Sequence, residues 1–305
     1  MITLVTFIAG IIMLWIGAGW FVKGSKGIAE SMNISPLMIG LTLGAVGTSM
    51  PEFMVSTMAA ASGMTDISLG NVIGSNMANI GLALGLGSLI FPVPVEKGVI
   101  KYDYWVLLSA GILLYLFSVN GTLGRSEGIL FIILFICYFV FLAARHKFST
   151  DKNPAAKKKY PILKCTVLFL SGAAGLTAGG KLIVMNAVKL AEVWGISEAV
   201  IGITVVAVGT SLPEIAVVIT GALKKQPEIS IGTIVGSNII NIFLISGVAA
   251  SISPIVIKGS EIIFQAPAVV LFTVLLFPVI IDRMIKRYEG GLLFICYAVY
   301  IFMLF

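Results

Sequence analysis

The chain has little charge, one histidine and few cysteines. Of its 305 residues only 11% are charged and 58% are hydrophobic, whereas an average soluble domain is about 25% charged. The cysteines, Cys137, Cys165 and Cys296, have neither metal-ligand spacing nor an even count, and His146 lies in a polar segment. This composition excludes a soluble domain and leaves almost no soft ligands for zinc or copper.

Apolar runs of about 20 residues recur along the whole chain, each long enough to cross a hydrocarbon core of roughly 30 Å as a helix. They do not alternate as the strands of an outer-membrane barrel do. No basic residue precedes the first run, which is therefore predicted to be a helix rather than a cleavable signal peptide. We predict an all-α membrane protein of ten transmembrane helices, at 3–22, 35–61, 69–93, 103–119, 127–144, 162–188, 197–222, 231–253, 262–281 and 289–305.

The basic residues lie between the apolar runs, so they predict membrane topology rather than a nucleic-acid partner. If the N-terminus is outside, the Lys-rich linker 145–160 and most other basic residues face the cytoplasm. We therefore expect a multi-pass protein of the plasma membrane, surrounded by lipid and working as a monomer, with both termini extracellular. Only four of the twenty Lys and Arg residues would then lie outside: Arg125, Lys181, Lys189 and Lys258.

The two halves of the chain repeat each other at a shift of 162 positions, which aligns 33–52 with 195–214 and 67–80 with 229–242. Five helices per half is an odd number, so the second copy must enter the membrane upside down. The predicted organisation is a first inverted repeat at 1–144, the cytoplasmic linker at 145–160 and a second inverted repeat at 161–305. Inverted repeats recur in secondary transporters, whose substrate site lies where the repeats meet.

Two acidic residues, Glu52 and Glu214, lie deep within apolar runs, at equivalent positions of the two copies. An ionisable group there costs at least roughly 2.5 kcal/mol and marks a functional site. Each follows a proline, Pro51 or Pro213, which leaves the carbonyl four residues earlier without its usual partner. Broken helices of this kind are tolerated in membranes where they line a cavity.

The side chains near these acids supply only oxygen for a cation. Ser75 and Asn79 are four residues apart and share a helix face, as do Ser237 and Asn241. Oxygen ligands suit hard cations, and Ca²⁺ takes about six to eight of them. Asn76 and Asn238 point about 100° away and are weaker candidates. The glycines of these segments leave open a packing role for the two serines.

The motifs GTSMPE at 47–52 and GSNMAN at 74–79, repeated as GTSLPE at 209–214 and GSNIIN at 236–241, resemble the alpha-repeats of the sodium/calcium exchanger family, in its prokaryotic type. The resemblance implies one Ca²⁺ site with adjacent Na⁺ sites between the second, third, seventh and eighth helices, and no prosthetic group. The implied metal ligands are Glu52, Glu214, Thr48, Ser49, Ser75, Asn79, Thr210, Ser211, Ser237 and Asn241, with the backbone carbonyls of Ala45 and Ala207.

The resemblance implies an antiporter that exchanges Ca²⁺ for Na⁺ by alternating access. Potassium-dependent relatives carry an acid where this chain has Asn241, so K⁺ independence is expected. Two carboxylates balance one Ca²⁺, and the three Na⁺ that the resemblance implies would make exchange electrogenic. A Ca²⁺/H⁺ exchanger of the same fold is the alternative. An enzyme is not expected, because two acids in identical motifs do not form an acid–base pair. A channel is disfavoured by the inverted repeat.

Overall fold

The structure is a computed structural model that describes residues 2–149, 161–193, 207–257 and 265–303, and these residues are mostly helical. Four two-residue strands, β1 (Val93–Pro94), β2 (Thr122–Leu123), β3 (Ile255–Val256) and β4 (Met284–Ile285), form two small ribbons. The helices, with π-helical turns labelled η, are α1 (Ile2–Met32), α2 (Pro36–Ile39), η1 (Gly40–Gly44), α3 (Ala45–Thr48), α4 (Met50–Ala61), α5 (Thr65–Met77), η2 (Ala78–Leu84), α6 (Gly85–Ile90), η3 (Val99–Asp103), α7 (Tyr104–Ser118), α8 (Arg125–Ser149), α9 (Ile162–Val193), α11 (Ala207–Thr210), α12 (Leu212–Leu223), α13 (Pro227–Ile239), η5 (Ile240–Ile245), α14 (Ser246–Ile252), α15 (Ala266–Ile280) and α16 (Arg287–Met303).

Within the described residues, six helices are long and apolar enough to cross a membrane, and the bent pair at 36–61 would make a seventh. The fold is therefore that of an all-α membrane protein. The other predicted spans, 197–222, 262–281 and 289–305, are described only in part, since 197–206, 262–264 and 304–305 lie outside the described residues. Most of the predicted linker, 150–160, lies outside them as well.

The first helix is longer than predicted, because α1 runs to Met32 rather than ending near residue 22. Its last turns contain Lys23 and Lys26, which end the apolar run without interrupting the helix. The helix stops where Asn33 adopts φ of 58°, a left-handed conformation that asparagine tolerates at helix ends. Hydrophobicity alone therefore marks where the apolar span ends and misses the end of the helix.

Elements of the first half recur in the second with bounds shifted by 162 residues. The shift relates α3 to α11, α4 to α12, α5 to α13 and α7 to α15. It also relates the two ribbons, because Val93 pairs with Ile285 and Leu123 pairs with Ile255. Each ribbon joins a strand of one half to a strand of the other, so the halves are linked at two places.

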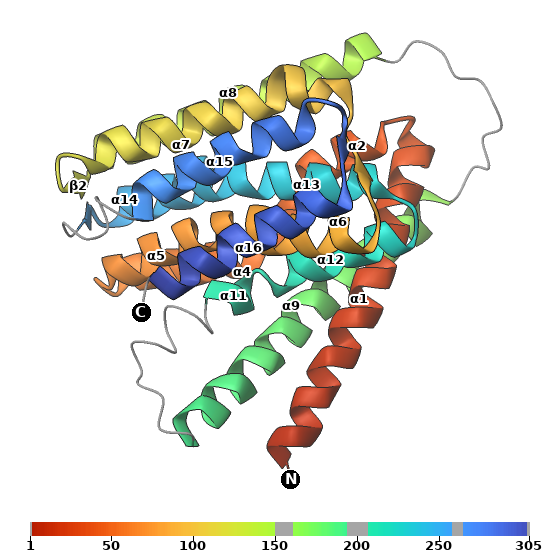
Figure 1. Ribbon diagram of the computed structural model, residues 1–305, viewed down its shortest axis with the longest axis horizontal. Coiled ribbons are helices and arrows are strands. Elements are labelled where there is room, and N and C mark those ends of the chain that lie inside the picture. The colour runs from red at the N-terminus through yellow and green to blue at the C-terminus, as the bar shows by residue number, and fades with distance from the viewer. Residues whose placement is uncertain (1, 150–160, 194–206, 258–264, 304–305) are drawn as a thin grey trace.

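The helices α1 and α9 pack against each other through glycines. A Cβ atom on Gly17 would lie 2.8 Å from the backbone nitrogen of Leu176, and one on Gly172 would lie 2.4 Å from that of Phe21. Small residues allow membrane helices to approach this closely. Figure 1 shows the pair inclined away from the other helices, with the N-terminus at the far end of α1.

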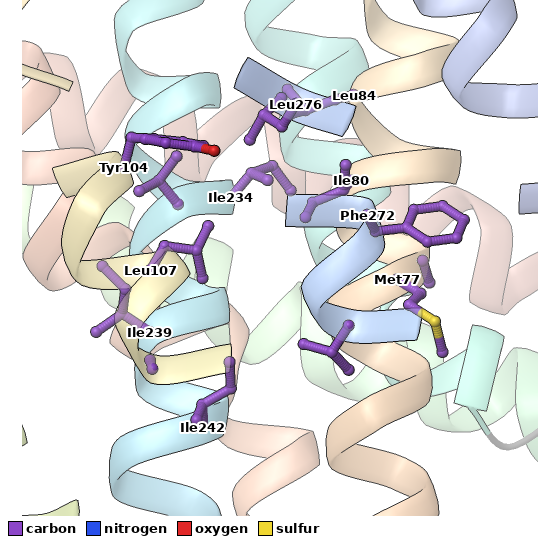
Figure 2. Close-up of a cluster of buried hydrophobic side chains, with 14 of the residues drawn as sticks. Met77, Ile80, Leu84, Tyr104, Leu107, Ile234, Ile239, Ile242, Phe272 and Leu276 are labelled. Carbon is purple, nitrogen blue, oxygen red and sulfur yellow. The ribbon is translucent and has the colours of Figure 1, made fainter. Parts of the chain in front are cut away.

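The largest apolar core lies between α5 with η2, α13 with η5, α7 and α15. Figure 2 shows Met77 and Ile80 with Phe272 of α15, and Ile234 with Leu107 of α7. The helices that hold Ser75 and Ser237 are thus fixed by apolar packing against their outer neighbours. Their polar side chains are left to meet α3, α4 and α11.

Candidate cation-binding site

Each buried glutamate follows a helix break. The segment Pro36–Thr48 and α4 meet at an angle of 46°, and the break falls at Ser49, which has φ of −80° and ψ of 8°. Ser211 has nearly the same backbone, φ of −82° and ψ of 1°, before α12. The proline after each break fits the first turn of the new helix. Glu52 and Glu214 therefore lie in the first turns of α4 and α12, where the helix dipole favours negative charge.

The two asparagines predicted as ligands lie in π-helical turns that continue α5 and α13. Asn79 is in η2, and Asn241 is in η5. Such turns are uncommon in proteins and are frequent at functional sites, since the wider turn displaces side chains from the regular helical positions. Ser75 and Ser237 occupy the preceding helical turns of α5 and α13.

Each carboxylate accepts a hydrogen bond from the other half of the chain. The Ser49 hydroxyl donates to Oε1 of Glu214 over 3.2 Å, and the Ser211 hydroxyl donates to Oε1 of Glu52 over 3.4 Å. Glu214 also accepts from Ser237 over 3.3 Å. The same oxygen of each glutamate is therefore fixed by a serine at the opposite helix break.

Further hydroxyl groups gather on the Glu214 side. The hydroxyls of Thr48 and Ser237 are 3.2 Å apart, and both lie near the carbonyl oxygen of Ala45, at 3.4 Å and 3.5 Å. On the other side of the site, the Asn241 amide donates to the Ser75 hydroxyl over 3.0 Å. Hydroxyl, amide and carbonyl oxygens thus surround the two acids.

Four side-chain oxygens in this site are buried and have no hydrogen-bond partner among the described residues: Oε2 of Glu52 and of Glu214, and Oδ1 of Asn79 and of Asn241. An unpartnered buried acceptor costs about 1–3 kcal/mol, so four in one place require an explanation. They form two pairs related by the 162-residue shift. All four are acceptors, so they suit a hard cation and cannot hold an anion.

The two acids of the site have no basic partner among the described residues. Glu52 and Glu214 are fully buried, and no Lys or Arg of the described residues forms a salt bridge with either. The other fully buried acid of the described part of the chain, Asp103, pairs with Arg145 at 3.0 Å. Within the described ranges, no three or more His, Cys, Asp and Glu side chains lie together so that they could hold a metal ion by themselves.

The predicted ligands are placed as follows. The predicted ligand residues other than Ala207 are at most 7% exposed. Ala207 is the first residue of α11, and its side chain is not among those that the structure describes. Thr210 donates a hydrogen bond to Oδ1 of Asn71 over 3.0 Å. The buried residues are Ala45, Thr48, Ser49, Glu52, Ser75, Asn79, Thr210, Ser211, Glu214, Ser237 and Asn241.

Two further polar residues hold predicted ligands in place: Asn238, which the sequence ranked only as a weaker ligand candidate, and Asn71, which sequence reasoning missed. The Asn79 amide donates to Oδ1 of Asn238 over 2.9 Å, so Asn238 fixes which way Asn79 points. Asn71 contacts Thr210 and lies one turn before Ser75 on α5. That spacing was the available signal, because residues four apart share a helix face.

These features define an all-α membrane protein with a buried, acidic, oxygen-lined candidate site for a cation. The family model described as sodium/calcium exchanger protein matches residues 2–144 and 164–305. The chain belongs to the sodium/calcium exchanger family.

Individual relatives agree with this assignment. The sodium/calcium exchanger MaX1 of Methanosarcina acetivorans is 30% identical over 97% of this chain and 96% of its own length. The inner membrane protein YrbG of Escherichia coli is 32% identical over 81% of this chain and 79% of its own. A structure of the sodium-calcium exchanger NCX_Mj, soaked with Na⁺ and Sr²⁺, is similar with a TM-score of 0.87 and 32% identity, covering 98% of this chain and 97% of that one.

Proposed function

We propose that this protein is an antiporter that exchanges Ca²⁺ for Na⁺ across the membrane by alternating access. The observation that carries the proposal is the set of four buried, unpartnered oxygens, two of them from carboxylates. The ligands are those named above, including the carbonyl of Ala207. Family membership supports the same transported ions, since MaX1 and NCX_Mj are both named as sodium and calcium exchangers.

The charge of the site supports electrogenic exchange. Glu52 and Glu214 supply two negative charges, whereas Asn79 and Asn241 supply none. One Ca²⁺ would neutralise the site, and three Na⁺ would leave it with one positive charge. Moving that charge couples turnover to the membrane potential by about 2.3 kcal/mol per 100 mV. The neutral side chain at Asn241 supports independence from K⁺.

The first experiment measures Ca²⁺ uptake into proteoliposomes loaded with Na⁺, with K⁺ or with a proton gradient. We expect uptake only from the Na⁺-loaded vesicles, unchanged by added K⁺ when the potential is held at zero. An inside-positive potential, set with valinomycin and K⁺, should accelerate it. Uptake that ignores the potential would mean electroneutral exchange, and uptake driven by the proton gradient would support a Ca²⁺/H⁺ exchanger, the competing function.

The membrane arrangement is a second proposal, supported by the odd number of predicted helices per half and by the positions of the basic residues. It consists of ten spanning helices in two inverted repeats, 1–144 and 161–305, in the plasma membrane of the cell. Both termini are extracellular, the linker 145–160 is cytoplasmic, and the monomer is the working unit.

This arrangement is tested with a cysteine placed at Ser149, in a background in which the three native cysteines are replaced by serine. An impermeant thiol reagent should label it only after the cells are opened. Labelling in intact cells would reverse the orientation. A matched cysteine at Ser126, predicted to be extracellular, should show the opposite pattern.

A further inference from the structure

Asn71 is buried beside the site and uses both ends of its side-chain amide. It is 4% exposed and lies on α5, one turn before Ser75. Its Nδ2 donates to the hydroxyl of Ser56 over 2.9 Å and to the backbone carbonyl of Glu52 over 3.3 Å. Its Oδ1 accepts a hydrogen bond from the Thr210 hydroxyl over 3.0 Å.

These bonds connect three elements from both halves of the chain. Asn71 belongs to α5, Glu52 to α4, and Thr210 to α11 at the opposite helix break. A threonine hydroxyl has one hydrogen to donate, and here it is directed to Asn71, which sets the direction of the oxygen's lone pairs. Asn71 thereby orients Thr210, a proposed cation ligand, without being a proposed ligand itself.

The equivalent position in the second half is occupied differently. The 162-residue shift places Thr233 where the first half has Asn71. Its hydroxyl is buried, lies against Gly44 and has no hydrogen-bond partner among the described residues. Thr48, the counterpart of Thr210, donates to the carbonyl of Gly44 over 3.2 Å. Asn71 therefore makes a bond to a threonine of the site that Thr233 does not make among the described residues.

We propose that Asn71 is a positioning residue for cation binding, acting through Thr210 and the backbone of Glu52. The proposal rests on the exchange function proposed above. Without Asn71 the Thr210 hydroxyl loses this acceptor, and the hydrogen bond between α11 and α5 is lost. Cations then bind a less preorganised site, although every proposed ligand is still present.

The test compares Asn71→Leu with Thr233→Val, two substitutions of similar shape at repeat-related positions. Na⁺-driven Ca²⁺ uptake is measured over a range of Ca²⁺ and Na⁺ concentrations, normalised to folded protein. We expect Asn71→Leu to raise the KM for Ca²⁺ about fivefold, with kcat within about twofold of wild type. Thr233→Val should leave both parameters unchanged, because its hydroxyl makes no described bond.

A residue needed only for folding would lower the amount of folded protein and leave the KM of the remainder unchanged, and this result would overturn the proposal. Equal effects of the two substitutions would overturn it as well. Should Asn71→Leu fail to fold, Asn71→Thr, which copies the second half, is measured instead with the same expected rise in KM. If wild-type protein shows no Na⁺-driven uptake, the proposed function has failed, and KM for whichever gradient drives uptake then tests Asn71 separately.

Discussion

The two halves of the chain can be compared position by position, because their elements recur at a shift of 162 residues. At the proposed cation ligands they agree: each has a helix break at a serine, a glutamate in the next turn and an asparagine in a π-helical turn. Beside these ligands they already differ, since Asn71 corresponds to Thr233. Away from the site they diverge. A cation held between the halves needs equivalent oxygens from both, whereas the outer helices need only pack well.

The divergence is clearest at Asp103, a fully buried acid of the first half. It accepts hydrogen bonds from the Tyr138 hydroxyl over 3.1 Å and from Arg145 over 3.0 Å. In the second half Asp103 corresponds to Gln265, which is neutral, and Tyr138 corresponds to Tyr300. Asp103 and Glu52 are equally buried, so burial alone does not distinguish a paired acid from a candidate ligand. The presence or absence of a cationic partner separates the two kinds.

The largest expected effect is loss of exchange on removing either site carboxylate. Glu52→Gln and Glu214→Gln should each reduce Ca²⁺ uptake at least about 100-fold, because a divalent cation loses half of its compensating charge. Uptake in proteoliposomes measures this, with Glu127→Gln and Glu289→Gln, a repeat-related pair outside the site, as controls. Near-normal uptake by either site variant would refute the symmetric site.

Breaking the Asp103–Arg145 pair should affect stability rather than transport. Arg145→Met leaves a buried carboxylate unpaired and should lower the free energy of unfolding by about 3 kcal/mol. The double variant Asp103→Asn, Arg145→Met has no buried charge, like the second half with its neutral Gln265, and should recover most of that loss. Thermal unfolding in detergent measures both. If the double variant is no more stable than Arg145→Met, the unpaired buried charge is not the cause of the loss, and the prediction is wrong.

The smallest expected effect tests the glycine contacts between α1 and α9. A Cβ atom on Gly17 would lie 2.8 Å from the Leu176 nitrogen, and one on its counterpart Gly179 would lie 2.7 Å from the Leu14 nitrogen. Alanine at either position should destabilise the protein by about 1–2 kcal/mol, and by similar amounts. Gly19→Ala is the control, since its Cβ would meet only the flexible end of Lys224. If the two variants lose different amounts of stability, the two glycines do not pack equivalently, and the prediction is wrong.

Much of this architecture could be predicted from the sequence. The apolar runs predicted an all-α membrane protein, and the repeated motif singled out Glu52 and Glu214, which the structure buries, because an acid in an apolar run is costly wherever the chain folds. The partners could not be predicted. That Ser49 binds Glu214 rather than its own neighbour Glu52, or that Asn238 orients Asn79, depends on how the halves pack together. The end of α1 was missed because backbone conformation at Asn33 decides it.

The two small ribbons have a consequence for how the halves are joined. Val93 of the first half pairs with Ile285 of the second. The first-half equivalent of Ile285 is Leu123, and it pairs with Ile255, the second-half equivalent of Val93. That reciprocity is the rule for an isologous dimer with a two-fold axis. The two ribbons thus pair as strands of a homodimer would, with the partner strand supplied by the same chain. A peptide connection between the halves then sets their stoichiometry at one to one, while their mutual register is set by the ribbons and the packed helices.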